Sequence, residues 1–159
     1  MLRGHSARLR PIGVAWLCVF GLGCATSTTK LVLGPVTAVR IVEADIAFVG
    51  RVDTGAEASS IHATELQLIA GDDGEPRLRF DIENEAGERV ILDRPIADVV
   101  EVRSAGGSEP RYRVLLTLAI GEVETRVLVT LRDRSAMTHK LLVGRDVLAG
   151  RFVVDVEAP

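Results

Sequence analysis

Residues 51–56 read Arg-Val-Asp-Thr-Gly-Ala and contain the motif on which the fold prediction depends. They end a strand-like run at residues 47–52, and a strand there would deliver the Asp53 carboxylate to the tip of a loop. Thr54 supplies a hydroxyl that can brace this loop. Gly55 permits backbone conformations closed to other residues and lets amide N–H groups approach the carboxylate. Asp, Thr and Gly are also ordinary turn residues, so the tripeptide alone fits a plain β-turn equally well.

The rest of the chain predicts an all-β domain. Its 159 residues are 47% hydrophobic but only 4% aromatic, so the core consists mainly of aliphatic side chains, many of them β-branched. Residues 59–69 fit a strand or a helix, residues 104–110 a Gly- and Ser-rich loop, and residues 145–149 one helical turn. Many short strands with regular turns indicate a barrel or a sandwich. The strand-like runs are residues 36–42, 47–52, 78–82, 89–92, 98–103, 112–120, 123–131, 141–143 and 152–156.

The N-terminal 24 residues have the layout of a secretory signal peptide. Arg3, Arg8 and Arg10 form a basic start without any acid, and residues 12–23 are apolar. This apolar run is short for a membrane span, although an uncleaved anchor is an alternative. We therefore predict export to the periplasm or the envelope of a bacterium.

Two cleavage sites compete in the signal peptide. Residues 22–25, Leu-Gly-Cys-Ala, resemble the end of a bacterial lipobox, which would make Cys24 a lipidated N-terminus that anchors the protein to a membrane. A standard signal peptidase would instead cut after Ala25. In either case we expect residues 25–35 to form a tether and residues 36–157 to form one domain.

Charge and cysteine content narrow the function classes. Residues 1–24 carry three arginines and no acid, so their removal changes the net charge from −3 to −6. An acidic domain argues against nucleic acid as a partner. Both cysteines, Cys18 and Cys24, lie in or at the end of the export segment, so the exported domain has neither a disulfide nor a thiolate metal site.

Several spaced segments, in the same order, resemble a bacterial family of retropepsin-like aspartic peptidases historically labelled ATP-dependent zinc proteases. The match covers most of residues 36–156. The resemblance implies a six-stranded acid-protease barrel with at most one short helix and one catalytic aspartate, Asp53, in each chain. The matching segments are residues 51–56, 59–63, 79–80, 102–104, 109–112, 130–137, 142–145 and 150–155.

The resemblance also assigns roles to the flanking residues. Thr54, Gly55 and Ala56 would support the active loop. The apolar segment ending in Gly, followed by Arg, would pack beneath it as a supporting strand; its residues are Leu142, Val143, Gly144 and Arg145. Ser60 and His62 follow closely enough to line a pocket or to support the loop.

Acid-protease hydrolysis needs two carboxylates that share a proton across a water molecule, one acting as base and the other as acid. The sequence contains a single Asp-Thr-Gly motif. A twofold homodimer that brings two copies of Asp53 together at the axis is the simplest solution. The expected substrate is a peptide or protein.

Two other functions compete with the peptidase interpretation. A zinc hydrolase would need three or four suitable ligands, but His5 lies in the export segment, and His62 and His139 stand alone. No phosphate-binding Gly-x-x-x-x-Gly-Lys-Ser/Thr loop is present, so we predict neither a metal nor another cofactor. A non-catalytic binding or scaffold protein on the same fold is the main alternative, because a fold does not determine function.

Overall fold

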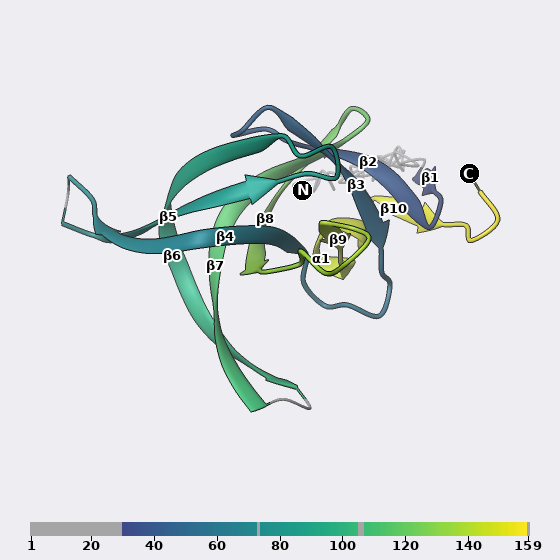
Figure 1. Ribbon diagram of the computed structural model, residues 1–159. Helices are drawn as coiled ribbons and strands as arrows, with labels where there is room; N and C mark the ends of the chain where they lie inside the picture. The colour runs from purple at the N-terminus through teal and green to yellow at the C-terminus, as the bar shows by residue number, and fades with distance from the viewer. Residues whose placement is uncertain (1–29, 73, 105–106, 159) are drawn as a thin grey trace, which may run out of the picture.

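The computed structural model describes residues 30–72, 74–104 and 107–158 (Figure 1). Within them the chain forms an eight-stranded sheet, a separate two-stranded sheet and one short helix. The elements are β1 (Leu31–Leu33), β2 (Val36–Ile41), β3 (Ile46–Val52), β4 (Ser60–Ala70), β5 (Pro76–Glu83), β6 (Arg89–Ser104), β7 (Gly107–Ile120), β8 (Val123–Arg132), β9 (Leu141–Val143), α1 (Arg145–Leu148) and β10 (Phe152–Val154).

The prediction of an all-β, barrel-like fold with at most one short helix is confirmed. The main sheet has the strand order β2-β3-β9-β4-β5-β6-β7-β8, and additional pairings of β2 with β7 and of β4 with β8 curl it towards a barrel. This sheet has eight strands rather than six. The long hairpins β4–β5 and β6–β7 extend well beyond the barrel (Figure 1).

The position of β9 brings together the two predicted segments of the site, the loop that begins at Asp53 and the apolar segment that ends at Gly144. β9 lies between β3, with which it is parallel, and β4, with which it is antiparallel. Val52 pairs with Val143, so β3 and β9 end at the same level of the sheet. The segments that leave these strands, the loop after Val52 and the helix α1, are therefore adjacent.

Alternating burial along the strands builds the core. In β3, Ile46, Phe48 and Val52 point inward and are buried. Gly50 occupies the remaining inward position, because a Cβ there would lie 2.8 Å from Val39 Cγ2. Burying each large aliphatic or aromatic side chain contributes about 1.5–3 kcal/mol, so this packing fixes the strand that carries Asp53.

Three local predictions needed revision or a decision. Residues 59–69 fit a strand or a helix by sequence, and all of them except Ser59 lie in strand β4. Residues 89–92 and 98–103 belong to one continuous strand, β6. The loop predicted at residues 104–110 is wrong, because Ser104 pairs with Gly107 in a tight hairpin and β7 begins there; residues 105–106 lie outside the described residues.

The Gly, Ser and Pro residues of the segment 104–110 suggest a loop, but an edge strand can also accommodate the proline. Pro110 pairs with Glu101 of β6, beyond the last pairing of β7 with β8. On this outer stretch β7 has a neighbour on one side only, and proline is tolerated on such an edge.

The predicted signal peptide at residues 1–24 lies outside the described residues. Within the stretch predicted as a tether, Leu31–Leu33 forms β1 and pairs in parallel with β10. Among the described residues, no helix has the length and apolar character that crossing a membrane requires.

Candidate active site

Asp53 directly follows β3, and its backbone and side chain are both held. Its N–H donates to the carbonyl of Val143 at 3.0 Å, which extends the β3–β9 pairing by one residue. Its Oδ1 accepts hydrogen bonds from the N–H groups of Gly55 at 2.9 Å and Ala56 at 3.2 Å. Within the described residues Oδ2 makes no hydrogen bond, and the side chain is partly exposed. One carboxylate oxygen is therefore fixed, and the other is open to a ligand or water.

Thr54 and Gly55 contribute to the loop through their backbones. Gly55 does not adopt the left-handed conformation; its role is close approach, since a Cβ there would lie 3.2 Å from Asp53 Oδ1. The Thr54 hydroxyl forms no hydrogen bond within the described part of the chain. The Thr54 backbone carbonyl is held instead, by the Arg145 side chain.

Arg145 clamps the loop from the start of α1. Its Nη1 donates to the carbonyls of Thr54 at 3.2 Å and Gly55 at 2.8 Å. Its backbone N–H donates to the carbonyl of Ala56 at 2.9 Å. Hydrogen bonds from a charged donor are stronger than neutral ones, so this contact stabilises the loop around the carboxylate.

The strand predicted to support the loop, β9, lies beside the strand that leads to Asp53. Val143 is fully buried and Leu142 half-buried. Leu142 pairs with Arg51 on one side and with Ser60 on the other. The strand therefore joins the segments before and after the active loop.

Sequence reasoning missed the pair that anchors the far end of the loop, Ser59 and Asp146. Ser59 is fully buried, and its hydroxyl donates to Asp146 Oδ1 at 2.7 Å and accepts from the Gly144 N–H at 3.0 Å. The Ser59 N–H donates to Asp146 Oδ2 at 2.9 Å. The one available signal was an acid directly after Gly144-Arg145, because acids are favoured in the first turn of a helix.

Gly144 permits this arrangement. A Cβ at this position would lie 2.7 Å from the carbonyl carbon of Ala58 and 3.0 Å from the nitrogen of Ser59. Both are backbone atoms, which cannot turn aside as a side chain can. The two segments pack at a distance that only glycine allows.

Ser60 and His62 lie on β4, just after the loop. The Ser60 hydroxyl is buried and makes no hydrogen bond. His62 is 5% exposed, and its Nδ1 accepts a hydrogen bond from the Arg134 N–H at 2.9 Å. Burial, assisted by the positive charge of Lys140, lowers the pKa of His62, although Asp133 acts in the opposite direction. The neutral imidazole thus helps to hold the loop of residues 133–140.

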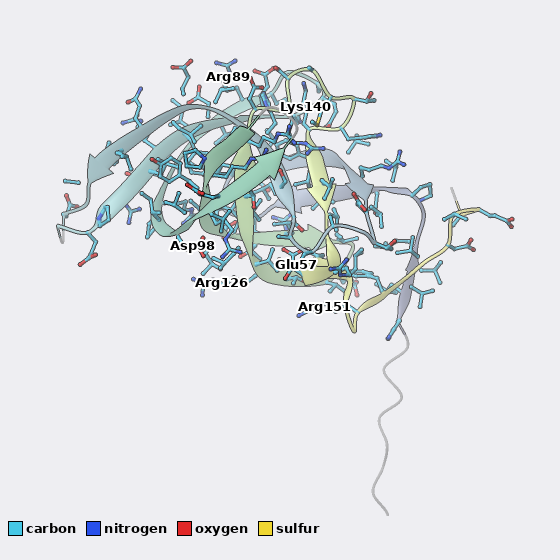
Figure 2. The ribbon with its side chains drawn as sticks, turned by 90° about the horizontal axis from the view of Figure 1, so that it is seen from below. Glu57, Arg89, Asp98, Arg126, Lys140 and Arg151 are labelled. Carbon is cyan, nitrogen blue, oxygen red and sulfur yellow. The ribbon has the colours of Figure 1, made fainter. Side chains whose placement is uncertain are left out.

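A pocket of about 400 Å³ lies next to the active loop. Glu57, Ala58 and Asp146 form its loop side. Figure 2 shows Glu57 on the same side of the molecule as Asp98, with Arg89 and Lys140 on the opposite side. The sheet side of the pocket consists of Arg113, Val127 and Leu128.

Arg113 is oriented by an ion pair with Asp98. Its Nε donates to Asp98 Oδ1 at 2.6 Å, and its Nη2 contacts Asp98 Oδ2. The hydrogen bonds from Arg113 lower the pKa of Asp98. This pocket therefore combines a fixed cation and two carboxylates with the aliphatic side chains of Val127 and Leu128, which suits an extended peptide better than a single small apolar ligand.

Residues 30–158, apart from 73 and 105–106, contain no group of three His, Cys, Asp or Glu side chains placed to hold a metal ion. The chemistry that the described arrangement offers is that of a carboxylate held for acid–base work at a loop tip.

Comparison with known proteins points in the same direction. A model of the RimB-like family, described as retropepsin-like aspartic endopeptidase RimB, matches residues 32–158. A crystal structure of a protein of unknown function from Legionella pneumophila superposes with a TM-score of 0.71 and 24% sequence identity, over 82% of this chain and 96% of that one. At this identity the likeness shows the fold alone.

Curated proteins similar to this chain are named as ligases rather than peptidases. A probable alpha-L-glutamate ligase from Shewanella pealeana is 34% identical over 109 residues, which are 66% of this chain and 24% of the relative. Another protein of the same name, from Parasynechococcus marenigrum, is 32% identical over 111 residues, 67% of this chain and 24% of the relative. The chain thus spans about a quarter of the length of the curated relatives it matches.

Proposed function

Because this chain belongs to the RimB-like family of retropepsin-like aspartic endopeptidases, we propose that it hydrolyses peptide bonds with water activated by Asp53. The observation that carries the proposal is the geometry of this carboxylate. Two backbone N–H groups hold Oδ1, while Oδ2 makes no hydrogen bond within the described residues and the side chain is partly exposed. A rigid carboxylate with one open oxygen is suited to take a proton from water.

One carboxylate completes only half of this chemistry, so the proposal includes a homodimer. Hydrolysis requires a second carboxylate that shares a proton with the first, and a twofold axis beside Asp53 supplies it. The dyad then titrates as a pair.

The small sheet of β1 and β10 supports a second copy as the partner. Leu31, Val32 and Val153 are 46%, 60% and 49% exposed, which is high for aliphatic side chains on neighbouring strands. Within the described residues β1 and β10 pair only with each other, so the sheet has open edges on both sides. An apolar sheet with open edges is a site for pairing with another chain.

The test is peptide hydrolysis by the purified protein and by its Asp53→Asn variant. We expect Asp53→Asn to lower kcat by at least about a hundredfold, the contribution typical of a general base. Asp45→Asn is the matched control, because Asp45 is an exposed turn residue with a side chain 87% exposed. Unchanged hydrolysis by the Asp53→Asn variant would rule the mechanism out.

A second candidate function is a binding module that does not cleave its ligand. It is favoured by the curated relatives, in which the similar segment occupies about a quarter of proteins named as ligases. A binding module would hold a peptide, for example one containing glutamate, at the same loop. A pepstatin-type mimic of the hydrolytic transition state separates the two functions: the peptidase binds it, and a module without hydrolytic geometry does not.

A further inference from the structure

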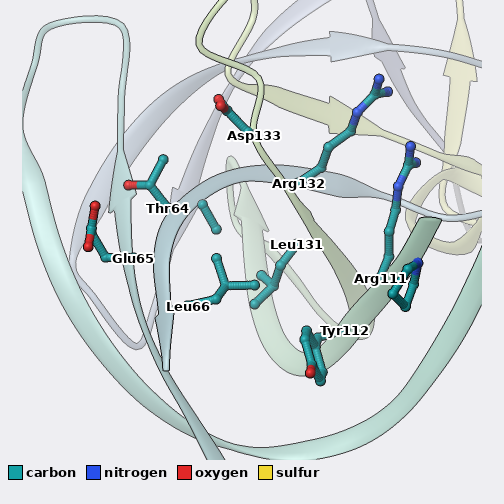
Figure 3. A pocket seen from close by; sticks show the side chains of 10 residues that line it. Thr64, Glu65, Leu66, Arg111, Tyr112, Leu131, Arg132 and Asp133 are labelled. Atoms are coloured by element: carbon teal, nitrogen blue, oxygen red, sulfur yellow. The ribbon is translucent and has the colours of Figure 1, made fainter. Parts of the chain in front are cut away.

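A second pocket, of about 380 Å³, lies between β4, β7 and β8 (Figure 3). None of its lining residues belongs to the active loop or to the segment of residues 141–146 beneath that loop. It is a separate feature of the barrel, with walls of different chemistry.

The pocket exists because two paired strands diverge. The ladder between β7 and β8 ends where Arg113 lies opposite Thr130. Beyond this point β8 pairs with β4, as far as His62 opposite Arg132, whereas β7 continues along β6. The sheet therefore opens between β7 and β8, and the residues that follow each strand line the opening.

A deformation of β4 forms another wall. The register between β4 and β5 shifts between Thr64 and Gln67, and within this bulge Glu65 has a φ of 52°. A non-glycine residue with positive φ is uncommon, and bulges and backbone strain of this kind cluster at binding sites. Here the bulge places Leu66, which is 38% exposed, in the pocket wall.

The walls combine cations with apolar surface. Figure 3 shows the guanidinium groups of Arg111 and Arg132 reaching in the same direction, while the carboxylates of Glu65 and Asp133 lie on the other side of the pocket. Within the described part of the chain, the Arg132 guanidinium makes no hydrogen bond or ion pair.

The apolar part lies between these charged groups. Leu66 comes from β4 and Leu131 from its neighbour β8, and Tyr112 lines the same space (Figure 3). Leu131 is 2% exposed and belongs to the core, so this part of the wall is fixed.

We propose that this pocket binds the C-terminal residue of a peptide chain. The terminal carboxylate pairs with Arg132, in the positive field to which Arg111 also contributes, and the side chain of the same residue packs against Leu66, Leu131 and Tyr112. Arginine is suited to bidentate recognition of a carboxylate. An apolar C-terminal residue presents both features at once, whereas an internal Asp or Glu offers the charge without the apolar group. Repulsion from Glu65 and Asp133 orients the carboxylate towards the arginines.

This docking site goes beyond peptide hydrolysis, and it is testable without hydrolysis. The protein is the full chain carrying Asp53→Asn, so that the probe is not consumed. The probe is a fluorescein-labelled peptide of four alanines and a terminal leucine, made once with a free carboxylate and once as the C-terminal amide. Fluorescence anisotropy at low salt gives the affinities.

We expect the acid to bind at least about tenfold more tightly than the amide, the difference expected for one charge-assisted hydrogen bond. Arg132→Gln removes this preference. Arg126→Gln is the matched control, because Arg126 is an exposed arginine of the same strand and lines neither pocket; it keeps the preference. Leu66→Ser weakens binding of the leucine peptide but not of a peptide ending in glycine.

Three results would overturn the proposal: equal affinity for acid and amide, equal losses in the Arg132→Gln and Arg126→Gln variants, or equally tight binding of an amide peptide with an internal glutamate. Equal losses in the two arginine variants would indicate a general charge effect. Tight binding of the peptide with an internal glutamate would indicate a site for side-chain carboxylates. The two proposals can fail separately. If the wild-type protein hydrolyses no peptide but the acid still binds more tightly than the amide, the binding pocket stands and the peptidase proposal is wrong.

Discussion

Two loops flank β9, and they are held by different means. The loop of residues 53–59, which carries Asp53, is fixed by backbone hydrogen bonds, by the Ser59–Asp146 pair and by the close approach of Gly144. The loop of residues 133–140 is held by the buried, neutral His62, by Glu85, which accepts from the Lys140 N–H, and by the Lys140 side chain, which donates to the Ser135 carbonyl. The first arrangement depends on shape, and the second depends in part on the protonation state of His62, so the two loops respond to different perturbations.

We expect the largest loss of stability from Gly144→Ala, which disturbs the packing of the first loop. The new Cβ would lie 2.7 Å from the Ala58 carbonyl carbon, and relieving this contact requires moving backbone. We expect the free energy of unfolding to fall by about 3 kcal/mol, at the upper end of overpacking effects. Urea denaturation measures it.

Gly87→Ala is the control for this variant, because Gly87 has a φ of +81° and nothing within 4 Å of an added Cβ. Its alanine meets no neighbour and carries only the backbone strain of a positive φ, about 1–2 kcal/mol. Equal losses in the two variants would show that close approach at Gly144 is unimportant.

A smaller effect is expected from Ser59→Ala, which removes one hydroxyl and keeps the packing. The buried Gly144 N–H loses its acceptor, and the half-buried Asp146 loses one donor. Leaving a buried polar group unpaired costs about 1–3 kcal/mol.

The neighbouring residue provides a matched control for the serine. The Ser60 hydroxyl is also buried but has no hydrogen-bond partner, so Ser60→Ala should leave stability unchanged or raise it. If the two variants lose the same stability in thermal denaturation, the Ser59–Asp146 pair does not anchor the loop.

The smallest effect at neutral pH concerns the second loop. Burial lowers the pKa of His62 below its ordinary value of 6.5, so below pH 6.5 the unfolded chain binds more protons than the folded one. Stability therefore falls as the pH drops through this window, by about 1.4 kcal/mol for each unit by which the pKa is lowered.

His62→Asn removes the titrating group and keeps an acceptor for the Arg134 N–H. We expect a constant loss from the smaller side chain and a flatter slope of stability against pH below 6.5, measured by urea denaturation at several pH values. An identical slope in the wild type and the variant would exclude His62 as the source.

The comparison of the two loops also separates what the sequence could predict from what it could not. The strand before Asp53, the apolar segment ending at Gly144 and the short helix all follow from local patterns, and the structure contains them. Local patterns suffice there because the hydrophobic period and the punctuating glycine lie within a few residues of each other.

The sequence could not predict contacts that depend on the register between strands far apart in the chain. Ser59 and Asp146 are 87 positions apart, and only the placement of β9 between β3 and β4 brings them together. The same holds for Arg111 and Arg132, which line one pocket because β7 and β8 diverge after a particular pair. A one-residue change of register would turn such side chains to the other face of the sheet.

We propose that the Asp53 loop of one chain supplies only one of the two carboxylates that an active site needs. The most direct measurement mixes wild-type and Asp53→Asn chains at constant total concentration, lets subunits exchange, and records peptide hydrolysis. If both carboxylates of a dimer are required, an equal mixture retains about a quarter of the wild-type activity, because only one dimer in four carries two intact loops. A retained activity of one half, proportional to the fraction of wild-type chain, would show that each chain acts alone and would contradict the account.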